Sequence, residues 1–472
     1  MKTPHVVIIG GGFGGLNAAR ALRKAPVRIT LLDRRNHHLF QPLLYQVATA
    51  ALNASDIAYP IRAALASQKN ARVLLAEAKS IDVAKRTVEL DAGMLTYDYL
   101  ILATGATHSY FGKDWAHVAP GLKSIEDALE IRRRIFLAYE AAEREADPAA
   151  QNEWLTFAVV GGGPTGVELA GALGEIGLHT LANDFRCIDP TQVKVLLFEG
   201  NDRVLGAYPP KLSAAAKRSL EQRHVAVRLD ARVTNIDARG VTVNEAGVET
   251  HVGTRTVLWA AGVQASPLAA SLGVPRDKAG RVIVEPELSV PGHPEIFVIG
   301  DLALMTNKDG TLVPGVAQGA IQGGKHVAKV IAAEVAGESM AGRLPAKKPA
   351  GRLPAKRPAR KPFVYWDKGN MATIGRASAV VATKRFAMHG FIAWLLWWAI
   401  HVMFLVGFRN RLLVMFHWAW SWLSFKRGAR LITGELSALP PVSSVGADGS
   451  AAVHHGAVTV SLQKHDQARP DA

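Results

Sequence analysis

Short apolar runs alternate with helical patterns along the first three hundred residues. The run at 5–9 is followed by glycines, a helical pattern at 16–22 and a second apolar run at 27–32 that ends in Asp33. Runs that are apolar throughout are typical of strands buried on both faces of a parallel sheet. The order therefore predicts a βαβ unit, with helices covering a parallel sheet.

The same order returns further along the chain. A strand at 157–160, a glycine-rich turn, a helix at 167–176 and a strand at 193–198 ending in Glu199 follow one another. Later, an apolar run at 295–299 precedes Gly300 and Asp301, and a helical pattern follows at 315–330. We predict an α/β protein with two Rossmann-like dinucleotide-binding domains.

The first glycine-rich turn has the spacing of a dinucleotide-binding motif. Gly10, Gly12 and Gly15 form G-x-G-x-x-G between the first strand and helix. The first glycine permits a tight turn, the second lets the backbone approach a pyrophosphate at the helix N-terminus, and the third allows close packing. Asp33, at the end of the next strand, is expected to bind ribose hydroxyls.

Gly161, Gly163 and Gly166 repeat this spacing, with Glu199 as the acid. The acid lies further along than usual because residues 177–192 resemble an inserted loop. A carboxylate there binds ribose hydroxyls and repels a 2′-phosphate, which favours NADH over NADPH. The nearby Arg203 weakens this preference.

Two dinucleotide sites in one chain predict that one holds a flavin and the other supplies hydride to it. We expect FAD in the first site and NADH in the second. Asp301, at a strand end, is suited to the ribityl or phosphate part of a flavin, although an N-cap of a following helix explains it equally well.

The segment 386–425 differs in kind from the rest, because six of the ten tryptophans lie there. Between residues 391 and 408 the only strongly polar residue is His401, so a spanning helix near the lower length limit is one interpretation. Tryptophans throughout the segment, followed by arginines, favour helices lying in the plane of the interface. A buried dimer interface is a third interpretation, compatible with the second.

Charge and cysteine content narrow the choice of partners. The net charge is +15, and eight basic residues with no acid lie in 341–361, around the repeat GRLPAKKPA/GRLPAKRPA at 342–359. We expect an extended linker that either attracts anionic lipid or is neutral in function, and no nucleic-acid partner. Cys187 is the only cysteine, so no disulfide or CxxC redox pair can form within the chain. We predict no metal site and no secretory signal.

Longer motifs resemble a known family. They are VVIIGGGFGGLNAA, DRRNHHLFQPLLYQVATA, ATGA, VVGGGPTGVELAGAL, IFVIGD, AQGAIQGG, DKGNMATIGR and GFRNR. Over residues 1–335 and 362–430 the chain resembles the type II NADH:quinone oxidoreductases, which are single-subunit flavoenzymes that do not pump protons. That family shares the architecture of the flavin disulfide reductases, but this chain lacks their cysteine pair.

The resemblance implies a role for each candidate residue. FAD would be held by Gly10, Gly12, Gly15, Asp33 and Asp301, with Thr104, Gly105, Phe40, Gln41 and Pro42 close to it. NADH would be held by Gly161, Gly163, Gly166 and Glu199, with Glu168 beside the nicotinamide and the flavin. Gln318 and Gln322 would line the quinone pocket, with Lys368 close by. Without the motifs, Glu168, Lys368 and both glutamines would be interpreted as solvated surface residues.

We therefore expect a membrane-associated NADH:quinone oxidoreductase at the cytoplasmic face of the inner (plasma) membrane, and we expect it to be a homodimer. The expected FAD-binding domain is discontinuous, at 1–115 and 270–335, and encloses an NADH-binding domain at 116–269. A basic linker at 336–361, a C-terminal helical membrane-anchoring region at 362–430 and a disordered tail at 431–472 are expected to follow. The alternatives are an NADH-dependent ferredoxin-type reductase, a sulfide:quinone oxidoreductase and a non-enzymatic flavin redox sensor.

Overall fold

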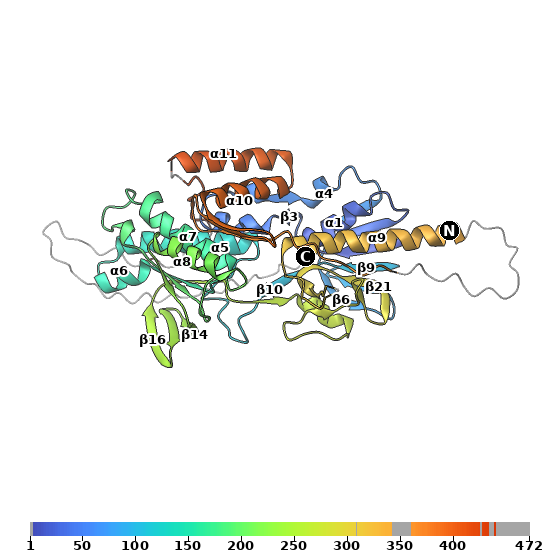
Figure 1. Ribbon diagram of the computed structural model, residues 1–472, viewed down its shortest axis with the longest axis horizontal. Helices are drawn as coiled ribbons and strands as arrows, with labels where there is room; N and C mark the ends of the chain where they lie inside the picture. The colour runs from blue at the N-terminus through green and yellow to red at the C-terminus, as the bar shows by residue number, and fades with distance from the viewer. Residues whose placement is uncertain (1–2, 308, 342–359, 425–426, 434–438, 440–472) are drawn as a thin grey trace, which may run out of the picture.

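The computed structural model describes residues 3–307, 309–341, 360–424, 427–433 and 439. The repeat at 342–359 and most of the expected tail at 431–472 lie outside these residues. The described chain forms two nucleotide-binding folds side by side, with the C-terminal helices lying across one side of them (Figure 1).

The first fold is built on a six-stranded sheet whose order is β20-β21-β9-β1-β2-β5. Its strands are β1 (His5–Ile9), β2 (Arg28–Asp33), β5 (Ala71–Leu75), β9 (Tyr99–Leu102), β20 (Ser289–Val290) and β21 (His293–Val298). All neighbouring strands are parallel except β20 and β21. The central strand β1 is buried along its whole length, as an uninterrupted apolar run predicts.

Two helices pack on one another beside this sheet. They are α1 (Phe13–Ala21) and α9 (Ala317–Ala341), and they approach closely because Gly14 and Gly324 carry no side chain between them. The helix α9 extends eleven residues beyond the predicted end at residue 330, so part of the expected linker is helical. Within the extension, the buried carboxylate of Glu334 accepts hydrogen bonds from Tyr99 Oη at 3.0 Å and from Arg360 Nε at 2.7 Å, which tie this part of α9 to the first fold.

The second fold has a four-stranded parallel sheet of order β13-β12-β11-β17. Its strands are β11 (Thr156–Val160), β12 (Lys194–Phe198), β13 (Val225–Arg228) and β17 (Thr256–Trp259), and its helices are α5 (Ile125–Arg144), α7 (Pro164–Glu175) and α8 (Pro210–Glu221). Between α7 and β12 lie a π-helical turn at Ile176–Thr180 and a 3-10 turn at Pro190–Gln192, so the expected inserted loop has local structure.

Short strands connect the two folds and form small additional sheets on them. The two segments that connect the folds form an antiparallel pair of strands, β10 (Ala106–His108) and β18 (Val263–Ala265). One three-stranded sheet, made of β14 (Ala231–Asp237), β15 (Gly240–Glu245) and β16 (Val248–Gly253), projects from the edge opposite the C-terminal helices (Figure 1). The first fold carries β6 (Ala78–Asp82), β7 (Thr87–Leu90) and β8 (Met94–Thr96).

The C-terminal region begins with an antiparallel sheet of β23 (Asn370–Thr373), β24 (Ala379–Ala382) and β25 (Ala387–Gly390). Two helices follow, α10 (Phe391–Phe404) and α11 (Phe408–Ser424), and α11 forms the outermost layer in Figure 1. Because the chain turns at Gly407, the apolar stretch is divided between two helices. Among the described residues no helix combines the length and apolar character needed to cross a bilayer.

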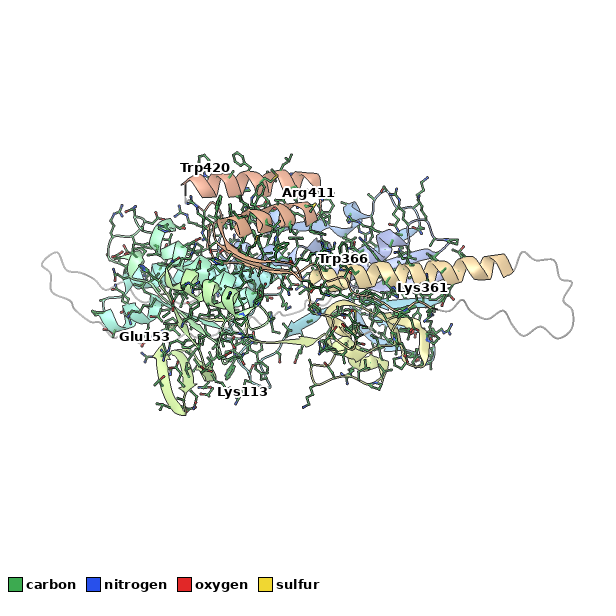
Figure 2. All side chains as sticks on the ribbon, viewed as in Figure 1. Lys113, Glu153, Lys361, Trp366, Arg411 and Trp420 are labelled. Atoms are coloured by element: carbon green, nitrogen blue, oxygen red, sulfur yellow. The ribbon has the colours of Figure 1, made fainter. Side chains whose placement is uncertain are left out.

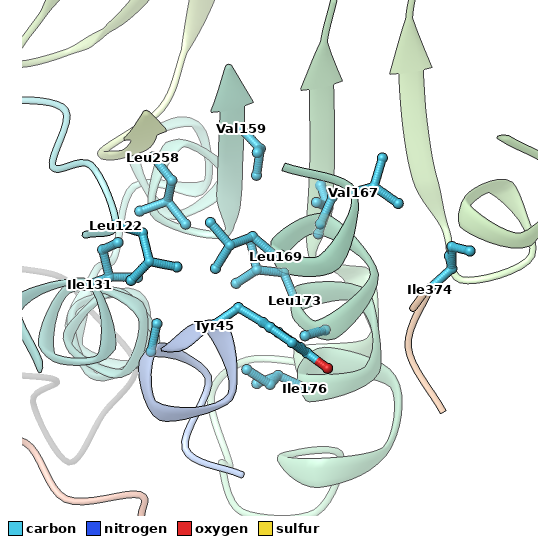
Figure 3. Packing of buried hydrophobic residues seen from close by; sticks show 14 of the residues in the cluster. Tyr45, Leu122, Ile131, Val159, Val167, Leu169, Leu173, Ile176, Leu258 and Ile374 are labelled. Carbon is cyan, nitrogen blue, oxygen red and sulfur yellow. The ribbon is translucent and has the colours of Figure 1, made fainter. Parts of the chain in front are cut away.

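One large hydrophobic core joins the two folds to the C-terminal region. It contains α2 (Leu44–Ala48) from the first fold, the inner faces of α5 and α7 from the second, and Trp397 and Trp418 from the C-terminal helices. Figure 3 shows Tyr45 of α2 lying alongside α7, near Leu173 and Ile176. This shared core fixes the two folds relative to one another.

Candidate functional site

A single cavity of about 1820 Å³ lies where the two folds and the C-terminal region meet. Its walls come from the first glycine turn, the start of α7, the start of α9, the β24–β25 turn and the end of α10. Pockets for one small ligand usually measure about 300–1,000 Å³. The cavity is therefore large enough for a dinucleotide cofactor together with a substrate.

The first glycine turn has the geometry expected of a pyrophosphate cradle. Gly10 has φ +104°, and a Cβ on it would lie 2.4 Å from the Ala103 carbonyl oxygen. A Cβ on Gly15 would lie 1.8 Å from the Gly10 carbonyl oxygen, so α1 could not pack on the turn. Gly12 is the N-cap of α1, lines the cavity and faces open space. A phosphate could thus approach the backbone and the helix N-terminus.

Polar groups on strand ends line the same part of the cavity. Asp33 accepts hydrogen bonds from the backbone N–H of Gly11 at 2.6 Å and of Arg35 at 2.7 Å, which fixes its carboxylate at the cavity wall. Asp301 lies in the turn after β21, at the same edge of the sheet because β21 and β2 run in the same direction. The hydroxyl of Thr104 is buried without a hydrogen-bond partner among the described residues, and Gly105 adjoins it. Buried unsatisfied groups facing a cavity suit a polar ligand.

Phe40, Gln41 and Pro42 also line the cavity, in the turn that leads into α2. The Phe40 ring meets Phe13 edge-on at 5.7 Å and His401 of α10 at 6.1 Å between centroids. An apolar wall of this kind is suited to a flat aromatic ring system.

The second glycine turn has the same local geometry as the first. Gly161 has φ +107°, and a Cβ on Gly166 would lie 1.8 Å from the Gly161 carbonyl oxygen, whereas Gly163 faces open space. Glu199 accepts a hydrogen bond from Gly162 N–H at 2.6 Å, as Asp33 does from Gly11. None of these glycines, nor Glu199, lines the large cavity, and α7 reaches it through Pro164, Thr165 and Glu168.

Glu168 has an unusual environment for a carboxyl group. It lies on α7 among apolar core residues and touches the cavity, and its nearest polar contact is the backbone N–H of Thr373 at 3.5 Å. Burial disfavours the charged form and raises the pKa of Glu168 to about 8, although the Thr373 N–H opposes the shift. The group therefore holds a proton at neutral pH and can release it to an acceptor in the cavity.

The two glutamines of α9 differ in position. Gln318 lines the cavity near the helix N-terminus. Gln322 does not line it, because its amide makes two hydrogen bonds with the backbone of Trp366, at 2.9 and 3.0 Å. Lys368 lines the cavity, with its ammonium group 5.3 Å from the Trp366 ring and 5.5 Å from the Phe404 ring. Of the two amides spaced four residues apart, that of Gln318 thus lines the cavity, and that of Gln322 holds the segment around Trp366 beside it.

Known proteins match this chain over most of its length. The family model of the pyridine nucleotide-disulphide oxidoreductases matches residues 4–324. The type II NADH:quinone oxidoreductase NdhA of Mycobacterium tuberculosis is 47% identical over 443 residues, covering 92% of this chain and 90% of that protein. A type II NADH:quinone oxidoreductase of Staphylococcus haemolyticus is 31% identical, covering 69% and 81%.

The chain belongs to the type II NADH:quinone oxidoreductases. In fold it matches the structure of NDH2 from Plasmodium falciparum in complex with NADH, with a TM-score of 0.78 at 18% identity, covering 89% of this chain and 98% of the other. A sulfide:quinone oxidoreductase from Aquifex aeolicus has a similar fold, with a TM-score of 0.64 at 20% identity. In this member of the family Cys187 is exposed and does not line the cavity. The resemblance of the motifs and the predicted α/β fold are thus confirmed.

Sequence analysis does not identify several polar groups of this type II enzyme's cavity. Lys123, just before α5, lines the cavity near Asp301, and burial lowers its pKa while Asp301 opposes the shift. His108 Nε2 lies 3.2 Å from the Asp127 carboxylate at the cavity wall. Tyr45 and Tyr208 reach it from α2 and the approach to α8. No spacing along the chain signals these residues, because each comes from a different element.

Proposed function

We propose that the chain oxidises NADH at a bound FAD and passes the electrons to a quinone, without pumping protons. One observation carries the proposal: a single cavity joins the first glycine turn to Glu168 of the second fold and to Gln318 and the C-terminal helices. The cavity therefore has room for a flavin, the hydride donor and an apolar electron acceptor to meet. Membership of the type II family supports the same reaction.

We assign FAD to the first fold, with residues 1–115 and 270–335 as its domain. Its phosphates would meet Gly10 and Gly12 at the N-terminus of α1, with Gly15 allowing the close packing. The polar and apolar groups that would surround the rest are Asp33, Thr104, Gly105, Asp301, Phe40, Gln41, Pro42 and Lys123. When bound, the flavin would accept the hydride and transfer the electrons.

NADH is assigned to the second fold, residues 116–269. The cradle of Gly161, Gly163 and Gly166 is open at its second glycine, as a pyrophosphate needs. Glu199 lies where ribose hydroxyls would bind, and its charge disfavours a 2′-phosphate, so we expect NADH to be preferred over NADPH. Because α7 begins at this cradle and carries Glu168 into the cavity, the nicotinamide would enter beside Glu168.

The quinone would enter beside α10 and bind near Gln318 and Lys368. The amide of Gln318 can donate to a quinone carbonyl, and the ammonium group of Lys368 would stabilise negative charge on it. The quinol gains two electrons and two hydrogens: NADH gives up both electrons and one hydrogen as hydride, and the second hydrogen would enter as a proton from solvent through Glu168. Gln322 acts indirectly, since it holds the Trp366 backbone beside Lys368.

The C-terminal helices are proposed to attach the enzyme to the cytoplasmic face of the membrane, without spanning it. Their outward faces expose Ile392, Leu395 and Met403 of α10 and Leu412, Phe416 and Trp420 of α11, which we call the membrane face. Trp420 lies on the outer side of α11 in Figure 2. Amphipathic aromatic-rich helices of this kind lie in the lipid interface. Part of this surface could serve a homodimer, which we also propose.

The experiment is to purify the full chain, record its visible spectrum, and add NADH and then a short-chain quinone. We expect a flavin spectrum that bleaches with NADH and recovers with quinone. In Glu168→Gln and Gln318→Ala we expect bound flavin to remain and quinone-dependent turnover to fall by about 100-fold or more. Colourless protein after reconstitution, or no bleaching, would refute the proposal.

The same measurements separate the alternatives. A ferredoxin-type reductase would bleach with NADH and reduce a protein acceptor faster than the quinone, whereas a redox sensor would bleach and turn over poorly with either. The exposed apolar residues of the membrane face favour the quinone reductase over the ferredoxin-type reductase and the redox sensor, because neither of these two needs them.

A further inference from the structure

A chain of hydrogen bonds connects the outer helix α11 to the cavity. The indole Nε1 of Trp418 lies 2.6 Å from Gln46 Oε1, and Gln46 Nε2 lies 2.8 Å from the hydroxyl oxygen of Tyr45. All three residues are buried. Tyr45 lines the cavity that also contains Glu168. These hydrogen bonds therefore lead from α11 to the wall of the cavity that holds the proposed proton donor.

The donor and the acceptor of each of these two hydrogen bonds can be assigned. An indole N–H can only donate, so the atom of Gln46 that faces Trp418 must be the carbonyl oxygen. The NH₂ group of Gln46 then faces Tyr45 and donates to its hydroxyl oxygen. Because that oxygen accepts this bond, the Tyr45 hydroxyl hydrogen is free to donate in another direction.

Burial is the largest cause that raises the pKa of Tyr45, and two carboxyl groups of α7 add to the shift. They are Glu168 and Glu175, seven residues apart on one side of the helix. Glu175 is already paired with Arg223 at 3.2 Å and Arg427 at 3.4 Å, and it accepts from the Arg376 backbone.

Among the described residues, Glu168 accepts one hydrogen bond, from the Thr373 N–H at 3.5 Å. It is therefore the acceptor with free capacity for the Tyr45 hydroxyl.

Other titratable groups face the same space from neighbouring elements. Burial lowers the pKa of His401 on α10 to about 4, so it is neutral near pH 7. Burial also raises the pKa of Tyr208, with Glu168 adding to the shift, so Tyr208 remains neutral. Lys368 lies at the cavity wall, and Arg427 reaches Tyr45 from the C-terminal segment. Near neutral pH, Glu168 is thus the group in this set that changes charge.

We propose that Tyr45 is a positioning residue that donates a hydrogen bond to the Glu168 carboxylate as Glu168 gives its proton to the quinone, and that Trp418 sets the direction of this bond through Gln46. The proposal rests on the proposed function. It links a residue of α11 to the acid in the cavity through two side chains. A hydrogen bond to the charged form of a carboxyl group stabilises that form and eases proton release.

The test is the pH dependence of quinone reoxidation after the full-length holoenzyme has been reduced with NADH in a stopped-flow instrument. In the wild type we expect the rate to fall as pH rises through the pKa of Glu168. In Tyr45→Phe the carboxylate loses its donor, so we expect this fall to move to higher pH by about one unit. The rate of flavin bleaching by NADH should remain unchanged.

Two further variants complete the set. Trp418→Phe keeps a ring in the core but frees the Gln46 amide to turn, so we expect a smaller shift in the same direction, and this variant decides the outcome if Tyr45→Phe does not fold. Tyr97→Phe is the matched control, because the Tyr97 hydroxyl is buried, has no hydrogen-bond partner among the described residues and does not line the cavity. Profiles of Tyr45→Phe and Trp418→Phe that coincide with that of Tyr97→Phe would overturn the inference.

A measurement without quinone separates this inference from the proposed function. Folded Glu168 keeps its proton up to about pH 8, whereas unfolded Glu168 loses it near its ordinary value, so the free energy of unfolding contributed by this group falls as pH rises between them. Glu168→Gln should remove this fall, and Tyr45→Phe should extend it to higher pH. If the wild type failed to reduce quinone, the proposed function would fall, while the unfolding curves would still decide whether Tyr45 acts on Glu168.

Discussion

At the scale of single residues, the site depends on small side chains that leave room and on one carboxyl group that burial keeps protonated. In the two turns, Gly10, Gly15, Gly161 and Gly166 bring backbone against backbone, and a Cβ at any of them would collide with a carbonyl group. Glu168 differs from Asp33 and Glu199, each of which accepts a short hydrogen bond from a glycine N–H. Acids at the strand ends and the acid on α7 therefore acquire different chemistry from their surroundings.

The second glycine turn allows a test at this scale. In Gly166→Ala, the new Cβ would lie 1.8 Å from the Gly161 carbonyl oxygen, so the turn and α7 must move apart. We expect flavin to remain bound, while NADH bleaches it at least about 10-fold more slowly because the cradle is distorted. The measurement is stopped-flow bleaching across NADH concentrations. Gly337→Ala, on the exposed part of α9 with open space around it, is the control and should match the wild type.

At the scale of elements, α10 and α11 each have two different faces. Trp397 and His401 stack at 4.2 Å on the inner face of α10, and Trp418 packs on Trp397 from α11. The opposite faces expose Ile392, which is 70% accessible, and Phe416, which is 67% accessible. Apolar groups exposed together on adjacent helices indicate a contact with another apolar phase or surface.

This arrangement predicts the effect of charge on the membrane face. Ile392→Glu and Phe416→Glu place a carboxylate where lipid would bind, so we expect binding to anionic vesicles to weaken by about 10-fold or more for each. Bleaching by NADH in solution should stay unchanged. Co-sedimentation with vesicles measures the effect. Val248→Glu, at an equally exposed apolar residue of β16 on the opposite edge, should bind vesicles as the wild type does.

At the scale of the whole molecule, the segment after α11 fastens the C-terminal region to both folds. The buried Arg427 donates to the Thr49 carbonyl at 2.7 Å and to the Ala172 carbonyl at 3.3 Å, and it pairs with Glu175. At the other end of α11, Asn410 donates to carbonyls of the first fold at 3.2 Å. The outer helix is therefore held at both ends, over the interface between the folds.

Replacing Arg427 tests this fastening. Arg427→Leu would leave two buried carbonyls and part of Glu175 without their partner, so we expect the free energy of unfolding to fall by about 3 kcal/mol. Denaturant unfolding followed by flavin fluorescence would measure it. The control is Arg430→Gln, which breaks a partly exposed pair with Asp184 and should cost less than about 1 kcal/mol. Equal losses in both variants would contradict a special role for Arg427.

Much of this organisation could be predicted from the pattern of residues. The uninterrupted apolar runs and glycine spacings predict both nucleotide folds, because a strand buried on both faces and a crowded turn each demand particular residue types. The predicted helix end at residue 330 was wrong, since α9 continues to Ala341. The contacts of Glu334 with Tyr99 and Arg360 in this part are tertiary and could not be predicted from the sequence. The expected pocket position of Gln322 likewise overlooked its bonds to Trp366.

The sequence by itself determined the two cradles, the acids that end their strands and the aromatic character of the C-terminal helices, because these depend on local geometry and composition. Only the tertiary structure decided which side chains share the cavity. Tyr45, Lys123, Glu168 and Gln318 come from four separate elements, and their protonation and hydrogen bonding depend on burial by the others. Such burial is a property of the packed molecule, and no spacing along the chain encodes it.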